Sequence, residues 1–149
     1  MRPESFRSLF PEPDHAEMTA RLKRPVMKTD IILDTDTFNE IDDQFALAYL
    51  LKSSESVVFQ AITAAPFYRD PRIGVCLSSD PKDGMEKSYD EILRILALCG
   101  RSDLSEIVYK GSEHYLPDET TPVESQAADA IIEISRRYNR DNPLYINHF

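Results

Sequence analysis

The 149-residue sequence is poor in cysteine, in long apolar runs and in positive charge, and each shortage excludes a class of protein. Its two cysteines, Cys76 and Cys99, form neither a CxxC nor a Cys/His pattern, so neither a disulfide framework nor a zinc site is indicated. No apolar run approaches the roughly 18 residues of a membrane span. The N-terminal stretch lacks the continuous apolar core of a signal peptide, and we therefore expect a cytoplasmic protein.

The charge of the chain is one-sided. Seventeen Lys and Arg residues stand against 26 Asp and Glu residues, which gives a formal net charge of −9 at pH 7. Such a chain presents no cationic surface for a phosphate backbone or an anionic lipid. We therefore expect no nucleic acid and no membrane as partners, and the sequence leaves a homo-oligomer open.

Residues 1–27 are polar and interrupted by prolines, which predicts a loosely attached or disordered arm. In residues 28–149 apolar runs alternate with amphipathic segments, which predicts one α/β domain of β-α-β-α-β-α-β order with a parallel, Rossmann-like sheet. The expected strands are Ile31–Thr35, Val57–Ala64, Ile107–Tyr109 and Leu144–Ile146, and the expected helices are Asp42–Lys52, Met85–Leu98 and Glu124–Tyr138. The last strand has no helix after it, so we expect a chain that is truncated at its C-terminus or completed by a partner.

The apolar spacing also predicts which side chains each helix buries. In the first helix these are Phe45, Ala46, Ala48, Tyr49 and Leu50. In the second they are Ile92, Leu93, Ile95, Leu96 and Leu98, with Gly100 as the helix end, and in the third Ala127, Ala130, Ile131 and Ile134. Thr121 and Glu124 fit a capping box before the third helix. The irregular segment 65–84 is either a lid over the sheet edge or a surface excursion.

Four carboxylates follow the first expected strand: Asp34, Asp36, Asp42 and Asp43. Like charges packed this closely raise one another's pKa and cost stability, so they are usually neutralised by a cation or a polyhydroxyl ligand. Helix capping and a solvated acidic loop would explain one or two of the four, but not all of them. The sequence therefore predicts a cation and sugar site at the carboxyl end of this strand.

The segment from Ile31 to Leu47, IILDTDTFNEIDDQFAL, resembles the signature of the inosine-uridine-preferring nucleoside hydrolases. Similar runs follow at residues 61–64, 108–112 and 142–146, so the resemblance covers roughly residues 28–146 and the N-terminal half of the family. It implies a nucleoside hydrolase-like fold and Ca²⁺-dependent hydrolysis of the N-glycosidic bond of a ribonucleoside. The small-molecule partner would be a nucleoside or a related riboside.

The resemblance also implies a role for each carboxylate. Asp36 would bind the metal and take the proton of the attacking water, and Asp43 would be the second metal ligand. Asp42 would hold the ribose 2′-hydroxyl, and Asp34 would brace the loop. The loop between Asp36 and Asp42 is two residues longer than the commonest family pattern, and the family's later ligands have no counterpart in these 149 residues. Impaired activity is therefore expected.

Two alternatives compete with this interpretation. Asp34-Thr35-Asp36 also resembles the nucleophile motif of haloacid-dehalogenase-like phosphatases, but Phe38 stands where that motif has Thr or Val, and the Asp42-Asp43 pair is left unexplained. A non-catalytic chain is the other alternative. None of the three histidines is expected to act in the site, and for His148 the reason is its position near the C-terminal end of the chain, in the region of the fourth strand.

Overall fold

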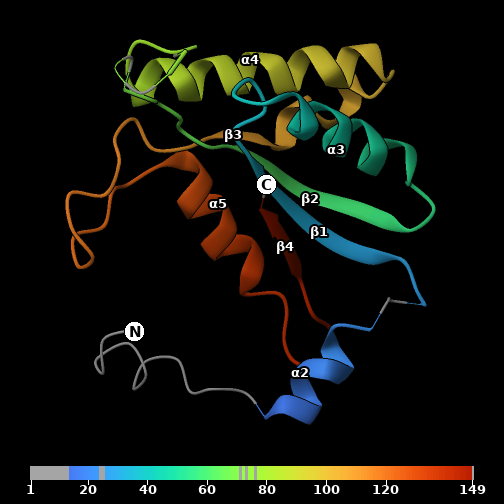
Figure 1. Ribbon diagram of the computed structural model, residues 1–149. Coiled ribbons are helices and arrows are strands. Elements are labelled where there is room, and N and C mark those ends of the chain that lie inside the picture. Colours follow the sequence, from blue (N-terminus) through green and yellow to red (C-terminus); the bar gives the residue numbers. More distant parts are fainter. Residues whose placement is uncertain (1–13, 24–25, 71, 73, 76, 149) are drawn as a thin grey trace.

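The structure is a computed structural model that describes residues 14–23, 26–70, 72, 74–75 and 77–148 (Figure 1). The elements are α2 (His15–Arg21), β1 (Thr29–Thr35), α3 (Ile41–Lys52), β2 (Val57–Ala64), α4 (Pro81–Leu98), the 3-10 helix η1 (Ser102–Ile107), β3 (Val108–Lys110), α5 (Gln126–Ser135) and β4 (Tyr145–His148). The strands form one parallel sheet in the order β3-β2-β1-β4. The predicted α/β class with a parallel, Rossmann-like sheet is confirmed. Within the described ranges, no helix has the length and apolar content needed to cross a membrane.

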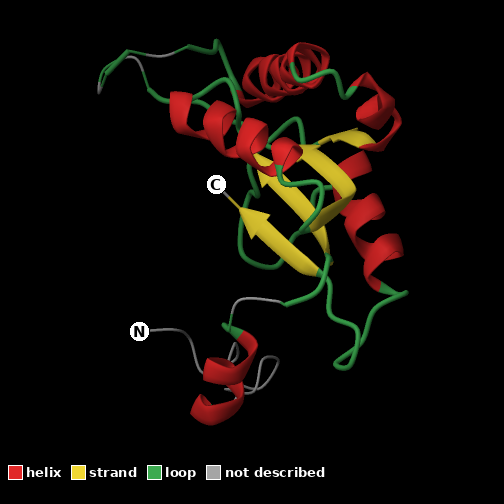
Figure 2. Cartoon of the chain, turned by 90° about the vertical axis from the view of Figure 1, so that its right-hand side faces the viewer, coloured by secondary structure: helices red, strands yellow, loops and turns green. Residues whose placement is uncertain are grey.

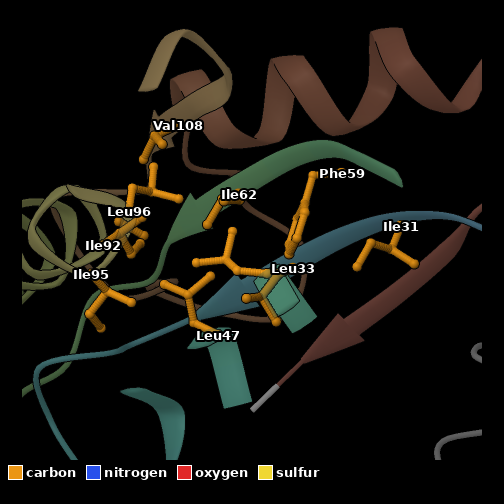
Figure 3. Packing of buried hydrophobic residues seen from close by; sticks show 11 residues of the cluster. Ile31, Leu33, Leu47, Phe59, Ile62, Ile92, Ile95, Leu96 and Val108 are labelled. Carbon is orange, nitrogen blue, oxygen red and sulfur yellow. The ribbon is translucent and has the colours of Figure 1, made fainter. Parts of the chain in front are cut away.

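The helices form a layer on each side of the sheet, with α3 and α4 on one face and α5 on the other (Figure 1). Successive side chains of a strand point to opposite faces, so β1 contributes to two cores. Ile31 and Leu33 pack with α3 and α4 in the larger core (Figure 3). Ile32 packs with Ile134 of α5 in the smaller one. This alternation decides which face each polar residue at the end of β1 will reach.

The edge strand β4 pairs with β1, because α5 carries the chain from β3 across the sheet to its other side. The register runs from Ile31 opposite Tyr145 to Asp34 opposite His148. On the other side of β1, Asp34 lies opposite Thr63 of β2. Three neighbouring strands therefore end at one edge with Thr63, Asp34 and His148 in a row.

The predicted buried face of α3 is wrong at its two aromatic residues. Phe45 and Tyr49 are 69% and 73% exposed, whereas Leu47 and Leu51 are buried, together with Asp43. The stripe that faces the sheet is the one that carries Leu47, Leu51 and Asp43, and the Asp43 carboxylate accepts a hydrogen bond from the hydroxyl of Thr35. The helix carries two apolar stripes, and its sequence alone does not say which of them faces the sheet.

Helix α4 begins at Pro81, four residues before the predicted start. The Asp80 side chain accepts a hydrogen bond of 2.8 Å from the backbone N–H of Asp83, and a proline suits the first helical turn. The irregular segment is therefore shorter than predicted and covers residues 65–80. At the other end, Gly100 has a φ of 69°, and Arg101 donates its backbone N–H to the carbonyl of Leu96 at 2.8 Å, as in a Schellman motif.

Two further expectations for the helices are wrong. Leu98 is 72% exposed, while the other predicted residues of this helix pack in the larger core. The predicted capping box before α5 does not form, because Thr121 donates its hydroxyl to Asp118 at 2.9 Å. Ser125 caps α5 instead, accepting from Ala128 at 3.1 Å. The predicted inward side of α5 is confirmed at Ala127, Ala130, Ile131 and Ile134.

Part of the predicted arm is helical. Residues 1–13 and 24–25 lie outside the described residues, but α2 occupies His15–Arg21, where no helix was expected. Figure 2 shows α2 apart from the sheet and its covering helices. Glu17 forms an ion pair of 2.9 Å with Arg140, which precedes β4. This ion pair joins α2 to a residue that is distant in the sequence and belongs to the domain.

Candidate functional site

The predicted acidic residues all follow the buried part of β1, at the carboxyl edge of the sheet. In open parallel sheets this edge is where ligands bind. The structure divides the residues between the two faces, because Thr35 lies on the side of α3 whereas Asp34, two residues after Ile32, lies on the side of α5. The site therefore consists of two groups rather than the single acidic cluster that the sequence indicated.

The group on the α3 side is built on Asp43. Its carboxylate is almost fully buried in the first turn of α3 and accepts the hydroxyl hydrogen of Thr35. Thr35 and Thr37 share a further hydrogen bond of 3.0 Å between their hydroxyl oxygens, and both are fully buried. The first turn of a helix favours a negative charge, so α3 helps to hold Asp43 in place.

Asp36 lies half-buried beside this group. Its carboxylate accepts a hydrogen bond of 2.9 Å from Nδ2 of Asn39, and its carbonyl accepts one of 2.7 Å from the Asn39 backbone N–H. Burial, and then the negative charge of Asp43, raise the pKa of Asp36 above its ordinary value, although the hydrogen bond from Asn39 acts in the opposite direction. Asp36 and Asp43 are therefore close enough to repel each other, and their loop keeps them there.

The segment after β2 lies against the acidic loop. The rings of Phe38 and Phe67 stack with their centroids 6.5 Å apart. Nη2 of Arg69 lies 3.6 Å from Oε1 of Glu40, which places a cation next to the carboxylates. Asp42, by contrast, is exposed on α3. The 65–80 segment thus contacts the candidate site through an aromatic pair and an ion pair.

The group on the α5 side joins three strands. Asp34 accepts a hydrogen bond of 2.6 Å from the hydroxyl of Thr63, and its other carboxylate oxygen lies 3.1 Å from Nδ1 of His148. His148, which was not expected to act in the site, lies beside Asp34 because β4 pairs with β1. The usual strand order of doubly wound sheets, in which the fourth strand lies next to the first, is the signal that could have found this contact.

Thr35, Thr37, Asn39 and Thr63 were also missed, because an isolated threonine or asparagine gives no signal in a single sequence. Among the residues that the structure describes, no group of three or more His, Cys, Asp or Glu side chains converges on a possible metal position. Asp36 and Asp43 nevertheless offer oxygen ligands, as does the Asn39 side chain, and oxygen is what a hard cation such as Ca²⁺ requires. The donors fit calcium in kind, and water or a substrate diol would supply the remaining ligands.

A cavity of about 550 Å³ lies elsewhere, near the start of β1, with Met27, Thr29, Glu55 and Tyr145 among its lining residues. None of the four predicted aspartates lines it. At the carboxyl edge of the sheet, Asp36 lies near Asp43, and Asp34 is turned toward His148. Comparison of the chain with protein-family models, with curated proteins and with solved structures found no match.

Proposed function

We propose that the acidic edge beside β1 binds a divalent cation, Ca²⁺ in the first place, and a riboside, and that it hydrolyses the N-glycosidic bond of a ribonucleoside. The proposal combines the resemblance of residues 31–47 to the nucleoside hydrolases with one structural observation. That observation is the proximity of the half-buried Asp36 to the almost fully buried carboxylate of Asp43. Two neighbouring carboxylates cost free energy in the absence of a ligand, and a bound cation would remove this cost.

The chemistry assigns one task to each side chain. A bound cation would orient the sugar diol and make a bound water more acidic. Asp36 would take a proton from this water, whose oxygen would bond to C1′ while the C1′–N bond breaks. The electron pair would leave with the base, which takes up a proton from solvent, and Asp36 would return its proton to solvent. A carboxylate beside a cation-bound water would be placed to accept its proton, which suits Asp36 to this role. Asp42 is exposed at the start of α3 and would accept a hydrogen bond from the ribose 2′-hydroxyl.

One contact weighs against the phosphatase alternative. In that mechanism Asp34 would be the nucleophile, yet its two carboxylate oxygens are hydrogen-bonded to Thr63 and His148. A non-catalytic chain that only binds a cation or a riboside is the second candidate function. Such a chain needs only the neighbouring carboxylates of Asp36 and Asp43 and no further catalytic side chain.

The test measures ribose release from inosine, uridine and a p-nitrophenyl riboside, with Ca²⁺ and with a chelator. Release that needs Ca²⁺ and is lost in Asp36→Ala supports hydrolysis. The matched control is Asp90→Ala, which removes an exposed carboxylate from α4 and should leave the rate unchanged. Phosphate release from a phosphomonoester with Mg²⁺ would favour the phosphatase instead.

Calcium binding is measured separately, as the rise in the midpoint of thermal unfolding. A ligand present at about 100 times its Kd stabilises the folded state by about 2.7 kcal/mol. Stabilisation that Asp36→Ala abolishes, without turnover of any riboside, supports the non-catalytic binding chain. If Ca²⁺ neither stabilises the protein nor supports turnover, the proposed site is wrong.

A further inference from the structure

The outer face of α3 carries a continuous apolar stripe. Ile41, Phe45 and Tyr49 are 68%, 69% and 73% exposed, and they follow one another at intervals of four residues. Side chains four positions apart on a helix are neighbours on one face, so the three form a single patch rather than scattered residues. Contiguous exposed apolar surface of this kind marks an interaction site more often than isolated residues do.

The opposite stripe of the same helix is already in use. Leu47 and Leu51 are buried in the core between α3 and the sheet, one turn apart along the helix (Figure 3 shows Leu47). Helix α3 therefore has apolar residues on two sides, of which the sheet covers one. A helix that is apolar on both sides is normally buried on both sides. We therefore expect a second surface to cover the exposed stripe, and the charged residues at the two ends of the stripe indicate what that surface is.

We propose that this stripe binds α3 of a second copy of the chain, with the two helices antiparallel around a twofold axis near Phe45. In this arrangement the two Phe45 rings meet at the axis, and Ile41 lies against Tyr49 of the partner subunit. A twofold interface is built from the same patch on both copies, so it must be self-complementary. The pattern of the stripe satisfies this requirement, because its two ends carry opposite charges.

The charges favour the antiparallel orientation over the parallel one. Glu40 and Asp42 flank the beginning of the stripe, and Lys52 stands at its end. Lys52 follows Ile41 by eleven residues, which is about three full turns at about 100° per residue. The Lys52 side chain therefore leaves the helix within about 20° of the direction of Ile41, on the same face. Antiparallel pairing puts Lys52 of the partner subunit beside Glu40, and the two helix dipoles then point in opposite directions and attract each other. Parallel pairing would instead place the two Glu40 side chains together and the two Lys52 side chains together.

The size of the apolar patch determines how tightly the two copies are expected to bind. Three large side chains and the stem of Lys52 provide less than the roughly 800 Å² per partner of a standard interface, so the dimer should be weak and reversible, with a Kd of roughly 10–100 µM. The proposal does not depend on the proposed hydrolysis, and its test does not use activity. A dimer without turnover, or turnover without a dimer, therefore separates the two.

The experiment is sedimentation velocity over a concentration series that spans this Kd, on the complete chain. The wild type should pass from monomer to dimer, and Phe45→Glu should remain monomeric because two charges would meet at the axis. Leu98→Glu is the matched control, since it places the same charge at an equally exposed apolar position on α4, and it should dimerise like the wild type. Circular dichroism of each variant verifies that it is folded.

A charge exchange tests the orientation. Lys52→Glu and Glu40→Lys should each weaken dimerisation several-fold, and the double variant should restore it. Because Glu40 also pairs with Arg69 within the chain, Arg69→Ala is the control and should dimerise like the wild type. The proposal is overturned if the wild type is monomeric throughout, or if Phe45→Glu dimerises as well as Leu98→Glu. Failure of the double variant to recover would overturn the antiparallel arrangement.

Discussion

Nδ1 of His148 lies 3.1 Å from the carboxylate of Asp34, although the two residues are 114 positions apart in the chain. The other carboxylate oxygen of Asp34 accepts the hydroxyl of Thr63 at 2.6 Å. Asp34 thus holds the ends of β2, β1 and β4 together through its side chain, in addition to the backbone hydrogen bonds of the sheet. These contacts go to the neighbouring strands, and the bracing of the acidic loop by Asp34 that the resemblance implied stays a prediction.

We predict that Asp34→Ala lowers the free energy of unfolding by about 1–3 kcal/mol, the usual cost of leaving a buried polar group without its partner. Thr63 is fully buried and would keep only a long contact of 3.4 Å to the carbonyl of Leu33. Urea denaturation measures the change. Asp90→Ala, on the exposed side of α4, should stay within about 0.5 kcal/mol of the wild type. An equally small effect of Asp34→Ala would contradict the bracing role.

Asp36 should make the stability of the metal-free protein depend on pH. Its pKa in the folded state is raised above the ordinary value of 3.8 by burial and by Asp43. The charged carboxylate therefore costs stability above the folded pKa, and this cost disappears as the pH falls through the folded pKa and below 3.8. We predict that Asp36→Asn stabilises the metal-free protein near neutral pH and loses this advantage in acid.

Urea denaturation at several pH values, with a chelator present, measures this effect of Asp36→Asn. The same substitution should weaken calcium binding, so the variant should be more stable without Ca²⁺ and gain less from its addition. Asp90→Asn serves as the control for removal of an exposed negative charge. Destabilisation by Asp36→Asn at neutral pH would show that the carboxylate is satisfied without a cation.

Gly84 should tolerate no side chain. A Cβ at this position of α4 would lie 1.9 Å from the carbonyl oxygen of Phe67, in the segment that also stacks on the acidic loop. We predict that Gly84→Ala costs about 1–3 kcal/mol or more, as overpacking does elsewhere. Gly74→Ala is the matched control, because among the described residues the nearest atom to its Cβ would be in the flexible side chain of Arg69, at 3.5 Å. Equal thermal midpoints for the two variants would contradict this packing.

Ser88 offers the opposite prediction. Its side chain on α4 is fully buried, and in the described structure its hydroxyl oxygen has no hydrogen-bond partner. Burial removes the hydrogen bonds that this hydroxyl makes with water in the unfolded chain, and no protein group replaces them. Ser88→Ala should therefore stabilise the protein by about 1 kcal/mol. Ser135→Ala, which removes a hydroxyl that is bonded to the carbonyl of Ile132 on the exposed side of α5, should not stabilise it. A loss of stability in Ser88→Ala would indicate a buried water at this hydroxyl.

The sequence determined what depends on neighbouring residues. Apolar runs placed all four strands to within one or two residues, and β2 lies at the predicted residues Val57–Ala64. Their alternation with helices indicated the parallel sheet, and the acidic run after β1 located the candidate site. These features depend on local periodicity and on turn chemistry, which a single sequence carries directly. The capping signals were less specific, because Ser125 and Asp80 compete with other polar residues that stand nearby.

Tertiary structure alone decided which side chains meet. Nothing near Asp43 in the sequence says that it faces Thr35, and the stripe of α3 that carries Asp43, Leu47 and Leu51 is the buried one, whereas Phe45 and Tyr49 are exposed. The encounter of His148 with Asp34 depends on strand order, and the separation of Asp34 from Asp43 depends on the faces of the sheet. Such contacts form only when segments that are distant in the sequence pack around a common core. Their free energy therefore depends on the packing of the whole domain and cannot be inferred from any one segment.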